Sequence, residues 1–433
     1  MRYSRHAVRG WRWQNEGKGD KAMKFKLTSL EKKWVLYDVG NSAFTMMVST
    51  IFPIYFNYLA DKGGLSDVEY LAYWGYAASV VTLLVALLGP VIGTLADTEG
   101  YKKPIFIAFI VVGIIACVSL GIAENWLLFL VIFIIAKVGY SGSLIFYDSM
   151  LSDVTTKERM DDVSSRGYAW GYIGSCIPFV ICLFVVLGSG KLGLSMEAAI
   201  GIAFVIISAW WLLFSLPLLR TYRQKYYIKK KKNAVADSFK RIGRTLKNAG
   251  NEKKILFFLI AFFFYIDGVY TIIDMATAYG SALGLDSTGL LLALLVTQIV
   301  AFPFAILFGR LAQKYPVEKL ITFCVTAYFG IAVFAMFLHS QWQFWVLAVL
   351  VGMFQGGVQA LSRSYFTKII PPEQSGEYFG ILDICGKGAS FVGTTIVSVV
   401  SQVTGNMNLG VGMIAILFVV GLFFFRKAAT TNA

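Results

Sequence analysis

Long apolar segments recur along almost the whole chain, separated by short polar stretches. Twelve of them are long enough, at about 1.5 Å of rise per helical residue, to cross a hydrocarbon core of about 30 Å. They lie at 34–59, 70–95, 104–123, 126–150, 167–188, 197–219, 255–280, 289–311, 319–338, 343–367, 379–402 and 409–425. A soluble domain does not carry such runs, so the pattern predicts an all-α membrane protein with twelve transmembrane helices.

The spans divide into two groups of six around a polar segment. We expect an N-terminal arm at 1–33, a first half at 34–219, a linker at 220–254, a second half at 255–426 and a tail at 427–433. The halves repeat weakly, because Gly-Thr-Leu-Ala-Asp at 93–97 aligns with Gly-Arg-Leu-Ala-Gln at 309–313. Such a parallel repeat is typical of transporters whose halves are related by an axis along the membrane normal.

The composition agrees with a membrane protein. Of the 433 residues, 57% are hydrophobic and only 15% are charged, against about a quarter in soluble proteins. The five cysteines lie inside apolar runs without metal-ligand or disulfide spacing, so we interpret them as packing residues and expect no metal or cofactor. Residues 1–22 show no periodicity, and we expect neither a cleaved signal peptide nor a function there.

The net charge of +14 is distributed unevenly over the polar segments. Almost all Lys and Arg residues lie in the arm and at 102–103, 157–166, 220–254, 310–319, 368 and 426–427, whereas the opposite loops carry only Lys62 and Lys191. This asymmetry places both termini in the cytoplasm, and the membrane is the plasma membrane if the source is bacterial. The basic residues then have lipid as their neighbour. We expect no nucleic-acid partner, and we expect a monomer.

The linker is the most basic segment of the chain. It holds thirteen Lys and Arg residues against Asp237 and Glu252. Val235, Phe239, Ile242 and Leu246 fall on one helical face. This predicts an interfacial helix on an anionic membrane leaflet, and a solvated basic linker is the alternative interpretation.

A motif between the second and third spans identifies the fold. In Gly-Thr-Leu-Ala-Asp-Thr-Glu-Gly-Tyr-Lys-Lys at 93–103, glycines allow close helix packing and a tight turn. The aspartate can interact with a neighbouring helix N-terminus, expected to be that of the eleventh helix near Gly380. The segment resembles the loop 2–3 motif of the major facilitator superfamily, which implies that fold, although Thr98 stands where the family usually has Arg. Its motif residues are Gly93, Asp97, Gly100, Lys102 and Lys103.

Five further segments carry a narrower resemblance, which covers nearly the whole chain from about residue 33. They are Tyr-Asp-Val-Gly-Asn-Ser-Ala-Phe at 37–44, Phe-Tyr-Asp-Ser at 146–149, Gly-Tyr-Ala-Trp-Gly-Tyr at 167–172, Gln-Ile-Val-Ala-Phe-Pro at 298–303 and Gly-Gly-Val-Gln-Ala-Leu-Ser-Arg-Ser at 356–364. Together they resemble the vacuolar amino-acid effluxer family of autophagy and its bacterial relatives. The resemblance implies a secondary transporter, with amino-acid export as the associated activity. Lys137 departs from it, since a neutral polar residue is expected there.

Polar and ionisable residues inside the spans mark the candidate site, because such groups are unfavourable in a bilayer unless they face protein or water. The ionisable ones fall on spans 1, 4, 7, 10 and 11, and spans 1, 4, 7 and 10 line the central cavity in the major facilitator architecture. Helix–helix hydrogen bonding without a transport role is the alternative interpretation. The candidate substrate and coupling residues are Asp38, Asn41, Ser42, Lys137, Tyr140, Asp148, Asp267, Tyr270, Gln298, Gln355 and Gln359.

Depth separates these residues into two layers. Near the cytoplasmic ends, the sequence predicts an electrostatic gate made of Asp38, Asp148, Arg363, Asp383 and Lys387. Lys137 and Asp267 each lie about 17 Å from a helix end, near the midplane. We expect Asp267 to couple transport to protons, and we expect the two residues to face each other as a clamp for a zwitterion. A fixed structural ion pair is the alternative for this pair.

The sequence favours a transporter over an enzyme. It contains no Gly-x-x-x-x-Gly-Lys-Ser/Thr loop, and its two histidines, His6 and His339, lie outside the cavity helices. We therefore expect a secondary transporter that moves a small polar solute by alternating access with proton coupling, with amino-acid export as the candidate activity. The alternatives are a transporter of a peptide, sugar or nucleoside, and a receptor that has the transporter fold but no transport activity.

Overall fold

A computed structural model describes residues 26–230, 240–241 and 252–431, without the side chains at 67–68, 71, 277–278, 281–282, 287–288, 291 and 387–391. The first half contains α1 (Ser29–Val48), α2 (Ile51–Lys62), α3 (Asp67–Ala96), α4 (Lys102–Ser119), η1 (Leu120–Ile122), α5 (Trp126–Ser149), α6 (Leu151–Val154), α7 (Met160–Leu187) and α8 (Met196–Thr221). The second contains α10 (Lys253–Ala282), α11 (Ser287–Leu311), α12 (Val317–Ala335), α13 (Gln341–Ile369), η2 (Pro372–Gln374), α14 (Ser375–Thr404), α15 (Met407–Gly412) and α16 (Ala415–Thr430).

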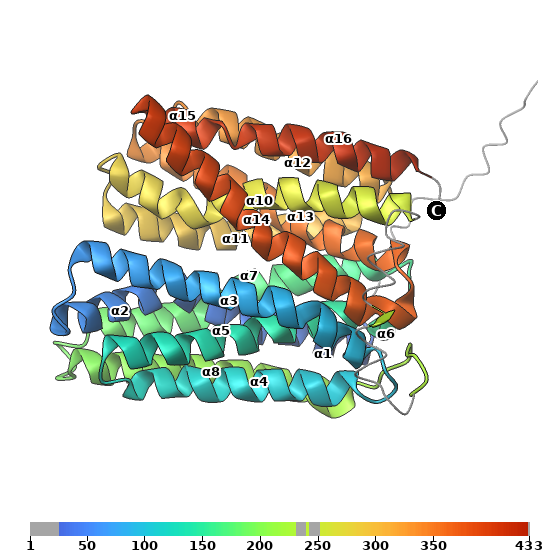
Figure 1. Ribbon diagram of the computed structural model, residues 1–433, viewed down its shortest axis with the longest axis horizontal. Coiled ribbons are helices and arrows are strands. Elements are labelled where there is room, and N and C mark those ends of the chain that lie inside the picture. Colours follow the sequence, from blue (N-terminus) through green and yellow to red (C-terminus); the bar gives the residue numbers. More distant parts are fainter. Residues whose placement is uncertain (1–25, 231–239, 242–251, 432–433) are drawn as a thin grey trace, which may run out of the picture.

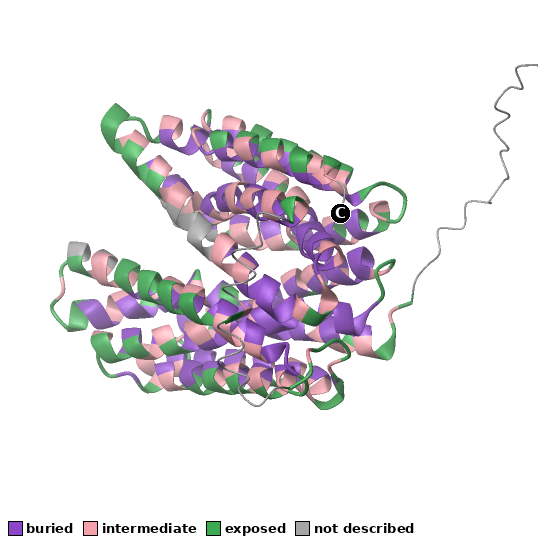
Figure 2. Cartoon of the chain, turned by 45° about the vertical axis from the view of Figure 1, so that its right-hand side comes forward, coloured by how far each residue is buried: buried purple, intermediate pink, exposed green. Residues whose placement is uncertain are grey.

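The two halves form separate bundles that lie side by side, with most helices along one common axis (Figure 1). One apolar core is built around Trp34 and Trp211 of the first half and another around Phe258 and Phe418 of the second. The second core also includes Val81, Val85 and Ile145 of the first half. Buried residues occupy the bundle interiors and also the region where the halves meet (Figure 2). The predicted fold of two six-helix halves is therefore confirmed.

The helix bounds differ from the predicted spans in a few places. Eleven of the described helices are long and apolar enough to cross a membrane, and α14 supplies the twelfth span. The first span is divided at Ser49 into α1 and α2, and the last is divided into α15 and α16. The chain enters α1 at Ser29, before the predicted boundary at 33, because Thr28 and Glu31 form a reciprocal capping box.

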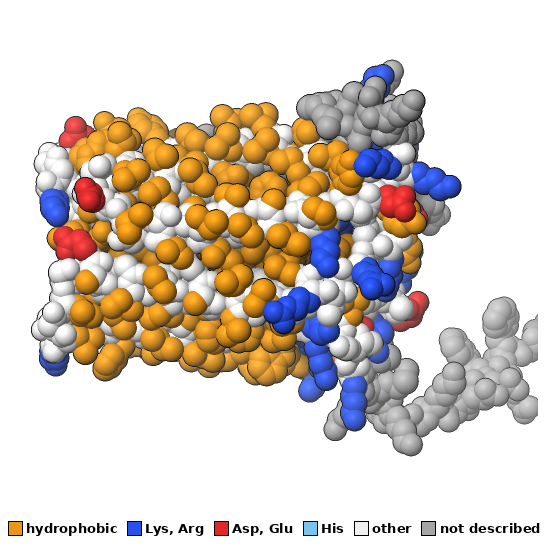
Figure 3. All heavy atoms as spheres, turned by 90° about the horizontal axis from the view of Figure 1, so that it is seen from below, with side chains coloured by type: hydrophobic (Ala, Val, Ile, Leu, Met, Phe, Trp, Pro, Cys, Tyr) orange, Lys and Arg blue, Asp and Glu red, His pale blue; other side chains and the backbone are white. Residues whose placement is uncertain are grey.

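The outer surface carries an apolar band that ends at a strongly basic end. Large apolar side chains such as Leu83 and Phe184 are 60% and 77% exposed, as expected for groups that face lipid. Lys and Arg residues gather at one end of the molecule (Figure 3). We call this the basic end. It contains the 97–102 loop, Lys157 to Arg159, the described start of the linker and the last turn of α16.

Helices α3 and α14 touch through their backbones near the basic end, where α14 leans obliquely against the first half (Figure 1). A Cβ atom on Gly93 would lie 2.2 Å from the carbonyl oxygen of Gly376, and one on Gly380 would lie 2.6 Å from that of Gly89. Only glycine permits such an approach. The four glycines therefore form a seam that brings the start of α14 against the end of α3.

The linker begins as a short strap across the 97–102 loop. Ile228 N–H donates to the Asp97 carbonyl at 2.8 Å, and Glu99 N–H donates to the Ile228 carbonyl at 3.0 Å. Beyond residue 230 only Lys240, Arg241 and the residues from 252 onward are described. The predicted interfacial helix therefore lies almost entirely outside the described residues.

Candidate functional site

Arg363 is the centre of the polar contacts that join the two halves. It extends from α13 of the second half, and its side chain is only 4% exposed. Its Nη1 donates to Asp148 Oδ1 at 2.8 Å, and its Nη2 lies 3.6 Å from Asp38 Oδ2. Its Nε and Nη2 also donate to the hydroxyl and carbonyl oxygens of Ser164, both at 2.9 Å. All three partners belong to the first half.

Three aromatic rings of the first half enclose the same guanidinium. Its Cζ lies 4.7 Å from the ring centroid of Trp34, 5.5 Å from that of Tyr147 and 4.3 Å from that of Tyr168. Arg stacks favourably on aromatic faces through its planar, delocalised charge. We call this set the cation cage; it consists of Trp34, Asp38, Tyr147, Asp148 and Tyr168.

The cage is held together by contacts within the first half. The Tyr147 hydroxyl donates to Asp38 Oδ2 at 2.7 Å, and Trp34 Nε1 donates to the Tyr147 carbonyl at 3.0 Å. The rings of Trp34 and Tyr147 are stacked, with their centroids 4.4 Å apart. A Cβ atom on Gly167 would lie 2.6 Å from Asp38 Oδ2, so the glycine makes room for the carboxylate. The cage is thus a preorganised feature of one half.

A pocket adjoins the cage between the two halves. Its free space is about 530 Å³, a volume that includes the open solvent at its mouth. Both halves contribute to a mixed lining of carboxylates, phenols and apolar groups. The lining residues are Ile145, Asp148, Tyr168, Phe262, Ile266, Tyr270, Gln359, Arg363, Phe379, Leu382, Asp383 and Gly386. A small solute carrying a polar or charged group fits this chemistry better than a purely apolar one.

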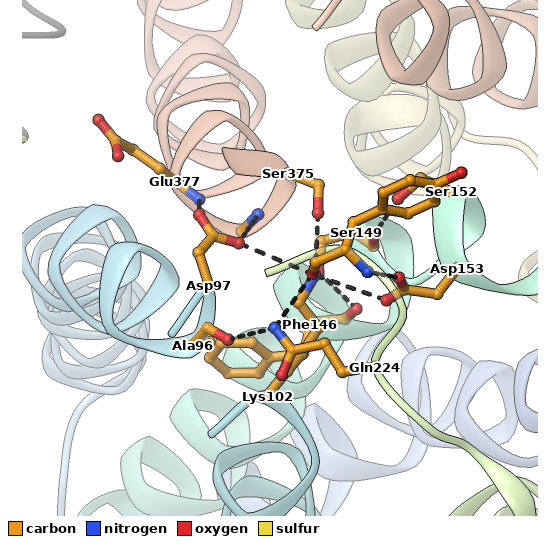
Figure 4. Close-up of polar contacts among 12 residues, drawn as sticks. Ala96, Asp97, Lys102, Phe146, Ser149, Ser152, Asp153, Gln224, Ser375 and Glu377 are labelled. Carbon is orange, nitrogen blue, oxygen red and sulfur yellow. Dashed lines mark hydrogen bonds and ion pairs between the residues drawn. The ribbon is translucent and has the colours of Figure 1, made fainter. Parts of the chain in front are cut away.

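A second network ties the loop motif to α14 (Figure 4). Asp97 accepts the N–H groups of Gly376 at 2.7 Å and Glu377 at 3.0 Å, which places its carboxylate at the positive N-terminus of α14. Lys102 Nζ donates to Ser375 Oγ at 2.9 Å and lies 3.8 Å from Asp97. Asp97 therefore contacts the N-terminus of the eleventh span, as predicted. This helix begins at Ser375, whereas the sequence placed its start near Gly380.

Arg241 of the linker completes this second network. It lies 3.0 Å from the Glu377 carboxylate and 3.6 Å from that of Asp97. A cation from the linker therefore stands near the motif that has Thr98 in place of the family's Arg. Burial raises the pKa of Asp97 to about 7, although the charges of Lys102 and Arg241 and the two backbone donors oppose this shift.

The other motif residues lie beside this network. Gly100 turns the chain at a φ of 77°, which favours glycine, and its N–H donates to Gln224 Oε1 at 3.2 Å. Lys103 is half-buried in the first turn of α4.

The described contacts of Asp267 and Lys137 are with different residues. Asp267 is completely buried, and both its oxygens accept the Gly393 N–H at 3.0 Å while one also accepts the Thr271 hydroxyl at 3.1 Å. Lys137 has its Nζ 5.3 Å from the ring centroid of Tyr140, and it interacts electrostatically with Asp274. These described contacts go to different residues, and the clamp between Lys137 and Asp267 stays a prediction.

The remaining predicted residues divide between the pocket and its surroundings. Tyr270, Gln359 and Asp383 line the pocket together with Asp148 and Arg363. The side chain of Lys387 lies outside the described residues. The others lie near the cage or in the helix contacts. The Asn41 amide donates a hydrogen bond to Asp38 at 3.4 Å, and Ser42 faces Gly171 of α7. The hydroxyl groups of Tyr140 and Thr45 are hydrogen-bonded to each other. Gln298 is half-buried, and the buried Gln355 Nε2 has no hydrogen-bond partner among the described residues.

Sequence reasoning missed four residues that contact the guanidinium: Trp34, Tyr147, Ser164 and Tyr168. Tyr147 and Tyr168 lie in segments that carry the family resemblance, and this position was the one feature of the sequence that could have marked them as site residues. Trp34 begins an apolar span, and Ser164 is a small polar residue in a basic loop region, so neither stands out by composition. Within the described residues, no group of three or more His, Cys, Asp or Glu side chains is arranged to hold a metal ion.

Twelve helices in two halves with a polar pocket between them define a transporter of the major facilitator superfamily. The fold is similar to that of the fucose:proton symporter FucP of E. coli, with a TM-score of 0.68, 15% identity and coverage of 93% of this chain and 98% of that one. It is also similar to the proton:xylose symporter XylE, with a TM-score of 0.71, 12% identity and coverage of 92% and 95%.

Residues 29–430 match the family described as "Vacuole effluxer Atg22 like", and the chain belongs to this family. It is 43% identical over 402 residues to the "Uncharacterized MFS-type transporter YxiO" of Bacillus subtilis, and the aligned region covers 92% of this chain and 94% of that protein. It is 25% identical over 282 residues to "Autophagy-related protein 22-1" of Aspergillus fumigatus, and the aligned region covers 59% of this chain and 46% of that protein.

Proposed function

We propose that this transporter moves a small polar solute, an amino acid in the first instance, out of the cytoplasm by alternating access. The pocket supports the proposal, because it lies between the halves and both halves supply its charged and phenolic groups. Arg363 carries the argument: it closes one side of the pocket by binding across the halves to Asp148. When this contact breaks, the pocket opens toward the basic end.

The proposed direction of transport is supported by the proposed orientation together with the family description. We propose that the basic end lies in the cytoplasm, because Lys and Arg residues concentrate on the cytoplasmic side of membrane proteins. The polar contacts between the halves cluster at this end, including those of Arg363 and Asp97, so the arrangement is closed toward the cytoplasm. The description of the family as effluxers supports export.

Asp267 is the proposed site of proton coupling. Its carboxylate is buried in the middle of α10, where its partners are the Gly393 amide and the Thr271 hydroxyl, both neutral donors. Neither of these described donors is a cation that would hold the carboxylate charged, and ionisable residues inside transmembrane helices form proton relays in transporters. Because Asp267 joins α10 to α14, its protonation would change a contact between two helices that both line the pocket.

Transport is tested with purified protein in liposomes. We expect the parent protein to exchange labelled amino acids for unlabelled ones, and to accumulate them when a pH gradient is imposed. Asp267→Asn is expected to keep exchange and lose the accumulation driven by the gradient. Asp61→Asn is the matched control, because it makes the same change at an exposed position.

Either of two outcomes contradicts these proposals. Full gradient-driven accumulation by Asp267→Asn removes the proton role of this residue. If the parent exchanges sugars or nucleosides and no amino acid, the solute class is wrong.

A further inference from the structure

The cation cage and its occupant come from opposite halves. The rings and carboxylates that surround the guanidinium lie on α1, α5 and α7, whereas Arg363 is carried by α13. The bonds that shape the cage, from Tyr147 to Asp38 and from Trp34 to Tyr147, connect first-half residues only. When the halves separate at the basic end, Arg363 leaves with the second half and the cage remains assembled.

An emptied cage attracts a new counter-charge. Asp38 is 6% exposed, and the side chain of Asp148 is 27% exposed. In the closed arrangement, leaving these two carboxylates without a cation would be strongly unfavourable. After the halves separate, water reaches the carboxylates, but two like charges held close together still attract a cation. Three electron-rich ring faces at 4.3 to 5.5 Å from the guanidinium carbon add to the preference for a positive charge.

We propose that the cage binds the cationic group of the transported solute, a guanidinium or a primary ammonium, in place of Arg363. The proposal rests on the proposed function and specifies its solute as one with a positively charged group. Asp148 and Tyr168 belong to both the cage and the pocket, so a solute can place its cationic group in the cage and its remainder in the pocket. The apolar lining by Phe262, Ile266 and Leu382 suits a hydrocarbon stem.

Arg363 and the solute are then alternative occupants of one site. In the closed arrangement, the guanidinium of Arg363 fills the cage and holds the halves together. A solute cation that takes its place stabilises the separated arrangement instead, because it binds only where Arg363 has left. The same exchange would keep an empty carrier closed toward the cytoplasm and let it open when a cationic solute is present.

Chemical complementation tests the cage directly. Arg363→Ala empties the site in purified protein, and guanidinium ion at millimolar concentration is the probe. Urea is the matched control ligand, because it is planar and of similar size but uncharged. We expect guanidinium to raise the melting temperature of Arg363→Ala and to bind it at least about tenfold more tightly than it binds the parent, whose site is occupied. Urea is expected to have no such effect.

Two further variants separate the cage from general ion binding. In Arg363→Ala combined with Asp38→Asn and Asp148→Asn, the shape is kept and the charge is lost, so guanidinium should no longer bind preferentially. Arg166→Ala removes a partly exposed cation that pairs with Asp162 on its own helix, and should gain no guanidinium site. Equal binding of guanidinium by Arg363→Ala and the triple variant overturns the proposal, as does equal stabilisation by urea.

A second measurement retains Arg363 and so does not depend on the stability of that variant. Ala360 is buried where α13 meets α7, and its carbonyl accepts the Ser164 hydroxyl at 2.8 Å. With Ala360→Cys, arginine or lysine should increase the rate of thiol labelling, and an uncharged amino acid of similar length such as glutamine should not. Labelling that responds to glutamine as strongly as to arginine contradicts the cationic solute. This outcome leaves amino-acid transport itself intact, whereas absence of amino-acid exchange in liposomes removes the proposed function.

Discussion

Removing the Arg363 side chain should open the basic end of the protein. Arg363→Ala deletes the ion pair with Asp148, the attraction to Asp38 and two hydrogen bonds to Ser164, all of which cross between the halves. The closed arrangement then buries two carboxylates that have lost their cation. Separation of the halves relieves this penalty, because water reaches the cage.

The size of the effect follows from the burial of the group. Removing one partner of a buried ion pair typically raises the free energy of the state that contains it by about 3–5 kcal/mol. Each 1.4 kcal/mol changes an equilibrium constant about tenfold. The ratio of open to closed protein should therefore rise by roughly two to three and a half powers of ten. In Arg363→Ala, the contacts of Asp97 with α14 and of Lys368 with Asp161 remain and continue to favour the closed arrangement.

Spin-label distances across the basic end measure this shift. Lys157 precedes α7 in the first half, Glu373 precedes α14 in the second, and both are exposed. Cysteines at these positions can be labelled selectively, because four of the five native cysteines are buried and the fifth is half-buried. Electron–electron double resonance should show a short distance in the parent and an added longer distance in Arg363→Ala. Arg166→Ala should resemble the parent.

One result would refute the reasoning. If Arg363→Ala folds and gives the same distance distribution as the parent, the ion pair does not hold the halves together. The seam between α3 and α14 would then account for closure alone.

Two further predictions concern that seam and the motif beside it. Gly93→Ala should increase the open fraction in the same assay, because its Cβ would lie 2.2 Å from the Gly376 carbonyl oxygen; Gly190→Ala, which has open space around it, should not. The closed fraction should also depend on pH. Burial raises the pKa of Asp97 to about 7 in the closed arrangement, and solvent exposure returns it toward about 4. The closed arrangement thus binds more protons and should lose population as pH rises from about 4 to about 7. Asp97→Asn should abolish this dependence, and an unchanged profile in that variant would exclude Asp97 as its cause.

The spans and the ion pair were predictable because the bilayer restricts what a sequence can contain. A stretch of about twenty apolar residues has few alternatives to a transmembrane helix. An ionisable residue within such a helix must find a partner or water, so charges at equal depth in the two halves identified Asp38, Asp148 and Arg363 as neighbours. The sequence could not show whether Asp38 or Asp148 binds Arg363 more closely. The aromatic residues around Arg363 could not be told apart from the many other aromatic residues of the apolar spans.

The surroundings of Asp267 could not be predicted from its depth in the helix. Asp267 and Asp274 are seven residues apart and lie on almost the same face of α10. Asp267 is nevertheless fully buried against Gly393 of α14, while Asp274 is exposed. Asp267 lies where α10 packs against α14, a helix that runs obliquely to most of the others (Figure 1). Helix crossing depends on the whole packing arrangement, which depth and periodicity do not contain.

The glycine seam limits how the two halves can move. Gly89 and Gly93 of α3 meet Gly380 and Gly376 of α14 backbone to backbone, with no flexible side chain between them. Sliding one helix along the other would bring a larger residue into a space that accepts only a hydrogen atom. Tilting lifts the two backbones apart without this obstruction. The seam therefore opposes sliding of α14 along α3 more than it opposes tilting, and we expect any relative motion of the halves to be a rocking rotation.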